Sequence, residues 1–561
     1  MTVRRVALPL LLALALVVAC APAAAPPPAA PAVAPGAPGA PAAPAAPAAP
    51  QPKKGGVLVF SASQPPDSIM PYKGGSIGEY IVFNGVYEGL VGWKLAPDLE
   101  VNEDYRSTYT IIPALADKWQ VAADNRTHTF TMRQGAKWHD GQPVTVDDVL
   151  FSYGLLMDKA NAYRGGTNLR DVESMEKVGA DQLKIVLKAP AAEFLAGIGA
   201  SNSAMFILPR HRADSLAAKE VVGSGPFKVK AMDFQSKAVY VRNDEYKAPG
   251  GGPYMDGAEL VFGLDRSGQL AAIAARKIDF HVVGDKKQME PILKAAPDLK
   301  TFTFFQTNGN HLYFRLDKKP FDDYRVRKAM DLAIDRQALV QALYFGEGVI
   351  NPPAGSGHKK GWGIPQEELL KLPGYRQPKD ADIAEAKRLL AEAGYADGLK
   401  TSIMTAIGRT STPPIAEAIA GQFRAVGIDM TIQAADRAAY NKKEKDGDFE
   451  INAALAAGDL PDERMFAFFY SKGNTSFVND PQLDALVERQ SRTLDVAQRG
   501  RLHGEIQKLV YDKAYALGTV DPASFVLVQP WVHNITINRG AQPYPMDWSP
   551  IWLDADKIPQ R

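Results

Sequence analysis

Cysteine is nearly absent from this sequence, with one residue among 561. The chain therefore cannot form an intramolecular disulfide bond or a metal site built from several cysteines. An excess of charge is also missing, because 64 lysines and arginines oppose 63 aspartates and glutamates. A near-neutral chain lacks the basic surface that nucleic-acid binding requires, so no nucleic-acid partner is predicted.

Motifs of catalysis are incomplete as well. Gly223-Ser-Gly lacks the first glycine of a serine-hydrolase motif, and His503-Gly-Glu lacks the second histidine of a zinc-protease motif. The stretch 394–401 ends in Gly-Leu-Lys-Thr, which does not fit a phosphate-binding loop. The eight histidines are dispersed, with no pair at helical spacing. We therefore predict no enzyme, no cofactor and no protein-held metal, with a secreted hydrolase as the minor alternative.

The N-terminus has the features of a secretory signal. Arg4 and Arg5 precede an apolar run at residues 6–19, which is too short to span a bilayer comfortably. The run ends in Val-Val-Ala-Cys, which resembles a bacterial lipobox and implies cleavage before Cys20 and acylation of its thiol. The alternative is an incidental cysteine in an ordinary cleaved signal. We predict an extracytoplasmic protein, lipid-anchored to the cell membrane, with residues 1–19 as signal peptide.

A tether follows the signal. Residues 21–50 contain only alanine, proline, glycine and valine. Proline fixes φ and offers no N–H, so this stretch cannot form a core or a lasting helix. We expect a semi-rigid connection over residues 20–53 that carries a globular body.

The body falls into two regions with different patterns. Before residue 310, segments alternate polar and apolar residues as half-buried strands do; they are residues 57–61, 129–133, 183–188, 238–242 and 258–262. From residue 320 apolar residues recur at helical spacing, Asp382 is a predicted helix N-cap, and Thr412-Pro413 starts another helix. Strands predicted at 400–405 and 428–433 flank that helix, which favours an α/β unit with parallel pairing.

Several motifs, in this order and spacing, resemble a known family. They occupy residues 55–68, 86–91, 115–119, 130–149, 223–227, 320–330 and 333–336. The longest is Phe-Thr-Met-Arg-Gln-Gly-Ala-Lys-Trp-His-Asp-Gly-Gln-Pro-Val-Thr-Val-Asp-Asp-Val at 130–149. From Gly55 to about Asp554 the chain is similar to the family 5 extracellular solute-binding proteins of ABC importers, the dipeptide, oligopeptide and nickel group.

The resemblance implies an α/β, two-lobed periplasmic-binding-protein-like clamp of type II with an extra inserted subdomain. Lobe I would comprise residues 54–83, 222–310 and 526–561, the inserted subdomain 84–221, and lobe II 311–525. The chain would cross between lobes near 308–316 and 525–533. Ligand that contacts both lobes only in the closed form would shift the open–closed equilibrium. A monomer would then dock on the permease of an importer.

Two residues are candidates for holding the ligand by this resemblance. The segment 406–413 is similar to one that carries a carboxylate-binding arginine in dipeptide binders, which here is Arg409. The segment 455–462 resembles one whose first aspartate takes the α-amino group of a peptide, which here is Asp459. The alternatives are a surface arginine before a helix and a helix N-cap or turn aspartate.

Two departures from the family pattern change the expected pocket. Ala456 stands where the family usually has a tryptophan, and Arg437, after Asp436, stands where dipeptide binders have an aromatic residue. A more polar pocket is therefore expected, with Asp436 and Arg437 in its wall. Trp362 is a candidate platform for a sugar or, alternatively, a packing residue.

The predicted function is that of a substrate-binding lipoprotein of an ABC importer for a peptide or amino-acid-derived solute. Opine, oligosaccharide and metal-chelate ligands remain alternatives, because one fold hosts many ligands. A receptor or chaperone-like lipoprotein without an importer is a further alternative.

Overall fold

The computed structural model describes residues 51–561 except for 63–64, 67, 74–76, 95–109, 162, 164, 200–204, 216–219, 248–249, 306–308, 356–361, 408–410, 457–460, 473–474, 537–543, 546 and 561. The predicted signal, Cys20 and nearly all of the tether lie outside these residues. Within the described part of the chain, no helix is long and apolar enough to cross a membrane.

The first sheet is built from the segments predicted to alternate. β1 (Val57–Ala62) pairs in parallel with β10 (Gly257–Phe262), followed by β9 (Lys237–Arg242) and β8 (Phe227–Asp233). Every second residue of β1 points into the core, where Phe60 meets the ring of Trp548 edge-on at 5.4 Å between centroids. Gly85 lies so close to Trp548 that an added Cβ would stand 2.3 Å from the indole, so this position requires glycine.

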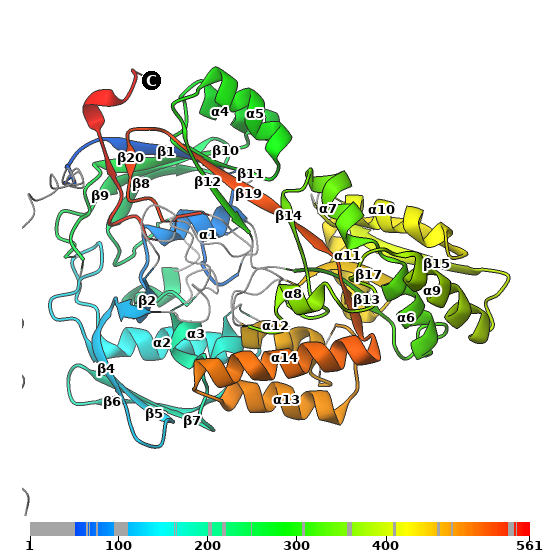
Figure 1. Cartoon of the computed structure of the whole chain (residues 1–561). Coiled ribbons are helices and arrows are strands. Elements are labelled where there is room, and N and C mark those ends of the chain that lie inside the picture. Colours follow the sequence, from blue (N-terminus) through cyan, green and yellow to red (C-terminus); the bar gives the residue numbers. More distant parts are fainter. Residues whose placement is uncertain are drawn as a thin grey trace, which may run out of the picture. The chain divides into compact units, whose positions relative to one another are not determined.

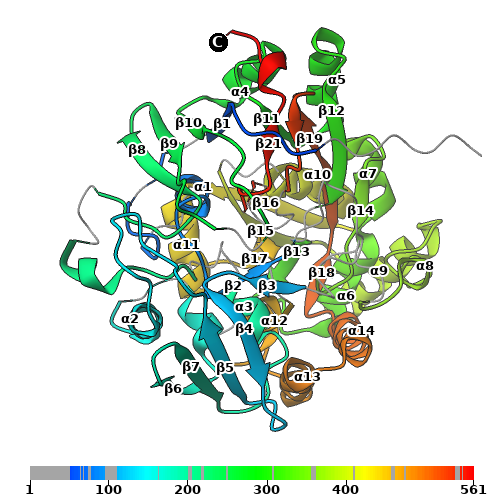
Figure 2. The ribbon, with the colours of Figure 1, turned by 90° about the vertical axis from the view of Figure 1, so that its left-hand side faces the viewer.

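A second antiparallel sheet lies within residues 84–221, the range predicted as an inserted subdomain. Its order is β4 (Ala116–Val121), β5 (Thr127–Met132), β7 (Gln182–Leu187) and β6 (Val172–Val178). Helix α2 (Val146–Met157) begins at a capping box in which Asp148 accepts from the backbone N–H of Thr145 at 2.7 Å. Figure 2 shows this sheet below the short strands β2 (Val91–Trp93) and β3 (Ile111–Pro113).

The third sheet has the predicted α/β character. Its order is β16 (Ile428–Ala435), β15 (Leu399–Ala406), β17 (Ile451–Ala456), β13 (Gly309–Phe314) and β18 (Ala516–Gly518). β15 pairs in parallel with both β16 and β17, which confirms the parallel unit. Helix α10 (Thr412–Arg424) begins at the predicted Thr412-Pro413 and packs on this sheet.

Helices surround the third sheet and complete a second core. α6 (Tyr324–Ala333), α7 (Arg336–Tyr344), α9 (Asp380–Glu392) and α11 (Arg437–Asp446) lie close to it, and α12 (Pro461–Phe469), α13 (Pro481–Arg492) and α14 (Val496–Lys513) form an adjacent group (Figure 1). The helical stripe predicted after residue 320 is buried here. The first sheets have a separate core, so the described body is a two-lobed α/β structure.

The chain passes between the two lobes at two places. β12 (Lys300–Phe305) belongs to the sheet order β11-β19-β12, whereas β13, next along the chain, belongs to the third sheet. β18 likewise belongs to the third sheet, but β19 (Val520–Val528) pairs with β14 (Gly348–Ile350) near its start and with β11 (Phe280–Val283) near its end. The chain therefore passes between the lobes from β12 to β13 and from β18 to β19, and the second passage, at 518–523, comes earlier in the chain than the expected 525–533.

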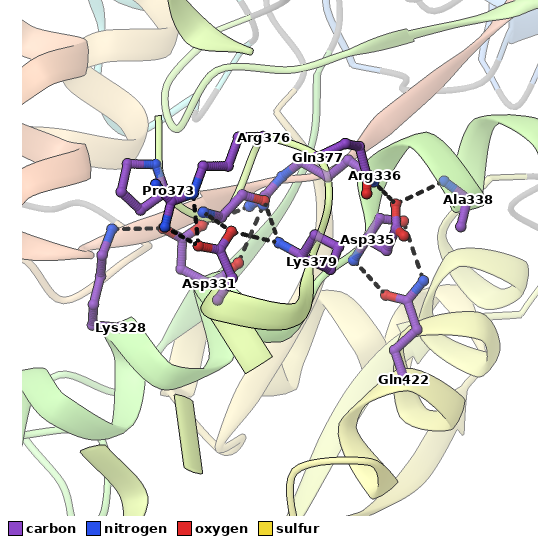
Figure 3. A network of polar contacts seen from close by, with 12 residues as sticks. Lys328, Asp331, Asp335, Arg336, Ala338, Pro373, Arg376, Gln377, Lys379 and Gln422 are labelled. Atoms are coloured by element: carbon purple, nitrogen blue, oxygen red, sulfur yellow. Dashed lines mark hydrogen bonds and ion pairs between the residues drawn. The ribbon is translucent and has the colours of Figure 1, made fainter. Parts of the chain in front are cut away.

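Buried ion pairs fix the helices of lobe II (Figure 3). Asp331, 2% exposed, binds Lys328 at 2.9 Å and Arg336 at 2.7 Å. Arg336 also donates to the carbonyl oxygen of Gly518, next to the second passage. Asp382 is not the predicted N-cap, because α9 begins earlier, at Asp380. Its carboxylate instead accepts from the backbone N–H of Gly374 at 2.7 Å.

Candidate functional site

The parallel strands of lobe II end at one edge of the sheet. Ala406, the last residue of β15, lies opposite Ala435, the last residue of β16, and Ala456 at the end of β17 lies opposite Gly309. In open α/β sheets, ligands bind outside the carboxyl ends of parallel strands. We call the connections that follow these ends, residues 407–411, 436–437 and 457–460, the strand-end site.

Four of the candidate ligand residues belong to the strand-end site. Arg409 follows β15, Asp436 and Arg437 follow β16, and Asp459 follows β17. Arg409 and Asp459 lie outside the described residues, so their side-chain contacts stay predictions. The three strand ends themselves lie at the same edge of the sheet, although they are far apart in sequence.

Helix N-termini add positive potential to this edge. α10 and α12 begin directly after their connections, and α11 begins at Arg437, the second residue of its connection. The N-terminus of a helix favours negative charge, because its first backbone N–H groups have no partners inside the helix. The side chain of Ser411, the N-cap residue of α10, makes no capping hydrogen bond: its hydroxyl donates to Asn310 Oδ1 at 3.0 Å instead. Carboxylates are therefore favoured ligands at the start of α10.

The structure assigns Asp436 a local role. Its Oδ1 accepts from the backbone N–H of Ala439 at 2.9 Å, so it is the N-cap of α11. Both Asp436 and Arg437 are exposed. Arg437 is the first residue of α11, and its guanidinium, unlike the capping carboxylate, is not needed to begin the helix.

A cluster of hydrogen-bonded polar residues lies at the passages between the lobes, and the sequence analysis did not predict it. Asn310, at the start of β13, donates its backbone N–H to Asp521 Oδ1 at 2.9 Å, and its carbonyl oxygen accepts from the backbone N–H of Thr519 at 3.0 Å. Burial raises the pKa of Asp521 to about 7, against hydrogen bonds from Asn310 and Asn351 that lower it. This group adjoins the strand-end site through Ser411. No local sequence signal marks it, because Asn310 and Asp521 are 211 residues apart.

Trp362 packs against helix α14. It is 8% exposed, its ring centroid lies 4.8 Å from that of His503, and the guanidinium of Arg499 lies 5.2 Å from the ring. A sugar platform presents an open ring face, so these contacts favour the packing alternative for Trp362.

A cavity of about 490 Å³ lies away from the strand-end site. Its lining residues come from 84–251 and 547–550, none of them in lobe II. Glu88 in its wall is already engaged, by Arg133 at 3.0 Å and by the hydroxyl of Tyr246 at 3.0 Å. The cavity therefore brings together none of the candidate ligand residues.

Two further observations concern the alternatives of catalysis and metal binding. Residues 74–78, Gly-Gly-Ser-Ile-Gly, match the serine-hydrolase motif, a match that sequence reasoning missed. That motif acts at a turn directly after a strand, whereas residues 69–73 form a bend and turn and α1 (Ile77–Asn84) follows. Ser76 itself lies outside the described residues. In the described part of the chain, no three histidine, cysteine, aspartate or glutamate side chains are grouped to hold a metal ion.

Comparisons with known proteins agree on one family. The family model for bacterial extracellular solute-binding proteins, family 5 (Middle), matches residues 110–477. The dipeptide-binding protein of Escherichia coli (strain K12) is 26% identical over 451 residues, covering 73% of this chain and 81% of the relative. Heme-binding protein A of Haemophilus influenzae is 26% identical over 463 residues, covering 75% and 81%.

A solved structure shares the fold. The periplasmic binding protein DppA from Helicobacter pylori, in complex with the peptide STSA, superimposes with a TM-score of 0.73 at 24% identity. The match covers 90% of this chain and 99% of that chain. At this identity the likeness shows the two-lobed fold alone.

Proposed function

Because the chain belongs to the bacterial extracellular solute-binding proteins of family 5, we propose that it captures a peptide or amino-acid-derived solute between its two lobes and delivers it to the permease of an ABC importer. Proteins of this family are extracytoplasmic substrate carriers, so the chain is a solute-binding protein and not an enzyme. The ligand class, the permease and the lipid anchor are the parts that we propose.

The observation that carries the proposal is the strand-end site. The last residues of β15, β16 and β17 lie at one edge of the lobe II sheet, and the charged candidate residues stand in the sequence between these strand ends and the first turns of α10, α11 and α12. Arg409, before α10, is suited to a ligand carboxylate, because an arginine fork binds carboxylates in a bidentate manner and the helix N-terminus adds to the attraction. Asp459, before α12, is suited to an α-ammonium group. Together they fit a zwitterionic ligand such as a peptide.

The ligand is expected to be more polar than a strict dipeptide pocket would select. Ala456, in place of a family tryptophan, removes an aromatic wall, and Arg437 adds an exposed guanidinium to the edge. Relatives are named for dipeptide and for heme binding. The heme-binding relative supports a metal chelate as the second candidate ligand.

Cys20 and the proline-rich segment complete the proposal. Acylation of Cys20 would anchor the protein, and residues 21–50 would place the body at a distance from the membrane surface. A carrier held in this way stays near the permease that receives its ligand.

Native mass spectrometry of the gently purified full chain tests the ligand class. A closed clamp releases its ligand only after opening, so we expect a discrete adduct whose fragments are those of a peptide or amino-acid derivative. A sugar or chelate adduct would keep the carrier function and overturn the ammonium role of Asp459. No adduct, together with no thermal shift in pooled peptides, sugars and opines, would overturn capture of these solutes.

A further inference from the structure

A buried group of charged side chains joins the range predicted as the inserted subdomain to lobe II. Glu193 directly precedes α3 (Phe194–Ile198), Asp462 lies in the first turn of α12, and Arg499 lies in α14. Their exposed fractions are 8%, 5% and 6%. Figure 1 shows α3 next to α12 and α14, although Glu193 and Arg499 are 306 residues apart. The three side chains therefore form a contact between the range predicted as the inserted subdomain and the helices α12 and α14 of lobe II.

Arg499 bridges the two carboxylates. Its Nη2 lies 2.7 Å from Glu193 Oε1 and 3.0 Å from Asp462 Oδ1. The other oxygen of Glu193, Oε2, accepts from the backbone N–H of Asp462 at 2.9 Å. Glu193 thus binds the first turn of α12 twice, once directly through the backbone and once through Arg499.

Neighbouring groups complete the hydrogen bonding of these charges. Gln490, on α13, donates to Asp462 Oδ1 at 2.6 Å and accepts from Arg499 at 3.2 Å. Arg170 lies 3.7 Å from Asp462 Oδ2 and places its guanidinium 4.2 Å from the ring centre of Phe466 on α12. A backbone hydrogen bond of 2.9 Å from Ala192 to the carbonyl oxygen of Ser491 accompanies them.

Burial makes the charges at this contact costly to separate. Burial and the nearby charge of Glu193 raise the pKa of Asp462, against the attraction of Arg499 and Arg170. Two buried carboxylates are tolerated when a cation lies between them, whereas removal of one partner leaves an uncompensated buried charge. Separation of α3 from α12 would break the Glu193–Arg499 ion pair and the hydrogen bond from the Asp462 N–H to Glu193, whereas the Arg499–Asp462 pair lies within lobe II.

The same turn of α12 belongs to the strand-end site. α12 begins at Pro461, directly after residues 457–460, and Asp462 is its second residue. A shift of this turn would move Asp462, the partner of Glu193. A ligand held by Asp459, two positions before Pro461 in the sequence, would on the proposed function act on the same turn.

We propose that Glu193, Asp462 and Arg499 form an interlobe lock that holds the closed clamp and sets the rate at which the solute leaves. The lock rests on the proposed function, since it requires a clamp that opens to release ligand. Arg499 and Glu193 are positioning residues: they act through the first turn of α12.

The distance between the lobes tests the lock without any ligand. Spin labels at Ala180→Cys on the inserted range and Ala425→Cys on lobe II, both exposed positions, report the separation once Cys20→Ser has removed the native thiol. We expect Glu193→Gln and Arg499→Lys each to increase the long-distance population at least threefold. Arg501→Lys, at an exposed position on the same helix, is the matched control and should leave the distribution unchanged.

Charge reversal separates the lock from a general loss of folding. The single variants Glu193→Arg and Arg499→Glu should each lose short-distance population, because each places like charges across the contact. The double variant restores opposite charges there, so it should recover at least half of that loss. A distance distribution that is the same in all variants would overturn the lock. A lower melting temperature in the single variants, with no change in the distance between the labels, would also overturn the lock. The three side chains would then stabilise the fold without holding the lobes closed.

Release of a probe peptide links the lock to function. Trialanine bound to the full chain is displaced by dilution and followed through tryptophan fluorescence, and the lock variants should release it at least fivefold faster. Unchanged release with normal binding would overturn the lock and leave the proposed function standing. Absence of trialanine binding in the unaltered protein, with the distance shift still present, would count against a peptide ligand and leave the lock standing.

Discussion

Asp331 and Asp521 are both buried carboxylates, and the protein surrounds them in opposite ways. Burial alone would raise the pKa of Asp331, but the charges of Lys328 and Arg336 outweigh it and lower the pKa (Figure 3). Asp521 has hydrogen bonds but no ion pair within the described residues, so burial dominates and its pKa rises to about 7. The first group holds helices together, whereas the second stands at a passage between lobes.

Removal of the Asp331 charge should strongly destabilise lobe II. Asp331→Asn leaves Lys328 and Arg336 without their buried counter-charge, so we expect a loss of about 3–5 kcal/mol in the free energy of unfolding. Urea denaturation followed by circular dichroism measures it. Glu385→Gln, which breaks the half-exposed pair with Arg388, is the control and should change little. Equal effects of the two substitutions would contradict this account.

Asp521 should make stability depend on pH near neutrality. The ordinary pKa is 3.8 and the folded one about 7, so the folded protein binds this proton more tightly than the unfolded chain. The stabilisation is complete at low pH and is lost as pH rises through about 7. Between pH 6.5 and 8 we expect the unfolding free energy to fall by at most roughly 1 kcal/mol per pH unit from this group.

Asp521→Asn is the test of that pH dependence. It removes the titration, so its stability curve from pH 6.5 to 8 should be flatter than that of the unaltered protein. Buried histidines such as His311, with a pKa lowered by burial to about 4, contribute in the opposite direction only at lower pH. Parallel curves in thermal melts across this range would show that Asp521 is not the responsible group.

The ligand residues should respond to single substitutions as well. Arg409→Ala and Asp459→Asn each remove one charge partner of a zwitterionic ligand, so we expect calorimetry to show at least tenfold weaker binding, about 1.4 kcal/mol. Arg424→Ala, in the last turn of the helix that Arg409 precedes, should bind normally. Unchanged affinity in both ligand-site variants would end the argument for a peptide-like pocket. A loss for Arg409→Ala alone would indicate a carboxylate ligand with no required amine.

Among the elements, those with local signals were the predictable ones. Thr412-Pro413 marked the start of α10, and the apolar period after residue 320 marked α6 and α7. Asp382 carried an N-cap signal as well, but its carboxylate is used by Gly374, Arg376 and Lys379 across a turn. A cap is a local preference, and here non-local hydrogen bonds decided the position of the helix start.

The candidate site was predictable only in part, for a related reason. Family resemblance indicated Arg409, Asp436, Arg437 and Asp459, and parallel pairing of the strands brings their connections to one edge. The Asn310–Asp521 contact and the interlobe lock had no such signal. Asn310 and Asp521 are 211 residues apart and Glu193 and Arg499 are 306 residues apart, whereas periodicity reports only on neighbours within a few turns.

The start of α2 offers a test at the scale of one helix. Asp148 is 4% exposed and accepts from Thr145 N–H, the Thr145 hydroxyl and, at 2.8 Å, from Arg210 N–H. Asp148→Ala leaves these donors unsatisfied, so we expect about 2 kcal/mol of lost stability in urea unfolding. Asp147→Ala, at the adjacent half-exposed position paired with Lys177, is a matched control and should cost clearly less. The reverse order would contradict the capping role.

At the scale of the whole molecule, two passages connect the lobes, and the lock is a contact that lies apart from both. At the passages, Asn310 and Thr519 are joined by a backbone hydrogen bond next to the connecting chain. The lock, by contrast, joins segments that are distant along the chain. A clamp of this kind opens at the contact that lacks a chain connection and bends at those that have one. The lock is therefore the part expected to separate during release.

The predicted anchor acts on the whole molecule too. Cys20→Ser removes the only thiol that can be acylated, so the protein should move from the membrane fraction to the soluble fraction in immunoblots of fractionated cells. Ligand binding by the released protein should be unchanged, since residue 20 precedes the tether. A parent protein already found in the soluble fraction would contradict lipidation.

The pairing of Asn310 with Thr519 has a consequence for how such proteins diversify. Its hydrogen bond of 3.0 Å joins the second residue of β13 to the residue directly after β18, so the roughly two hundred residues between them form an insertion with adjacent ends. An insertion of that kind can be exchanged between relatives without rebuilding its host. Recombination at two neighbouring junctions would then transfer the lobe II part of a ligand preference from one carrier to another.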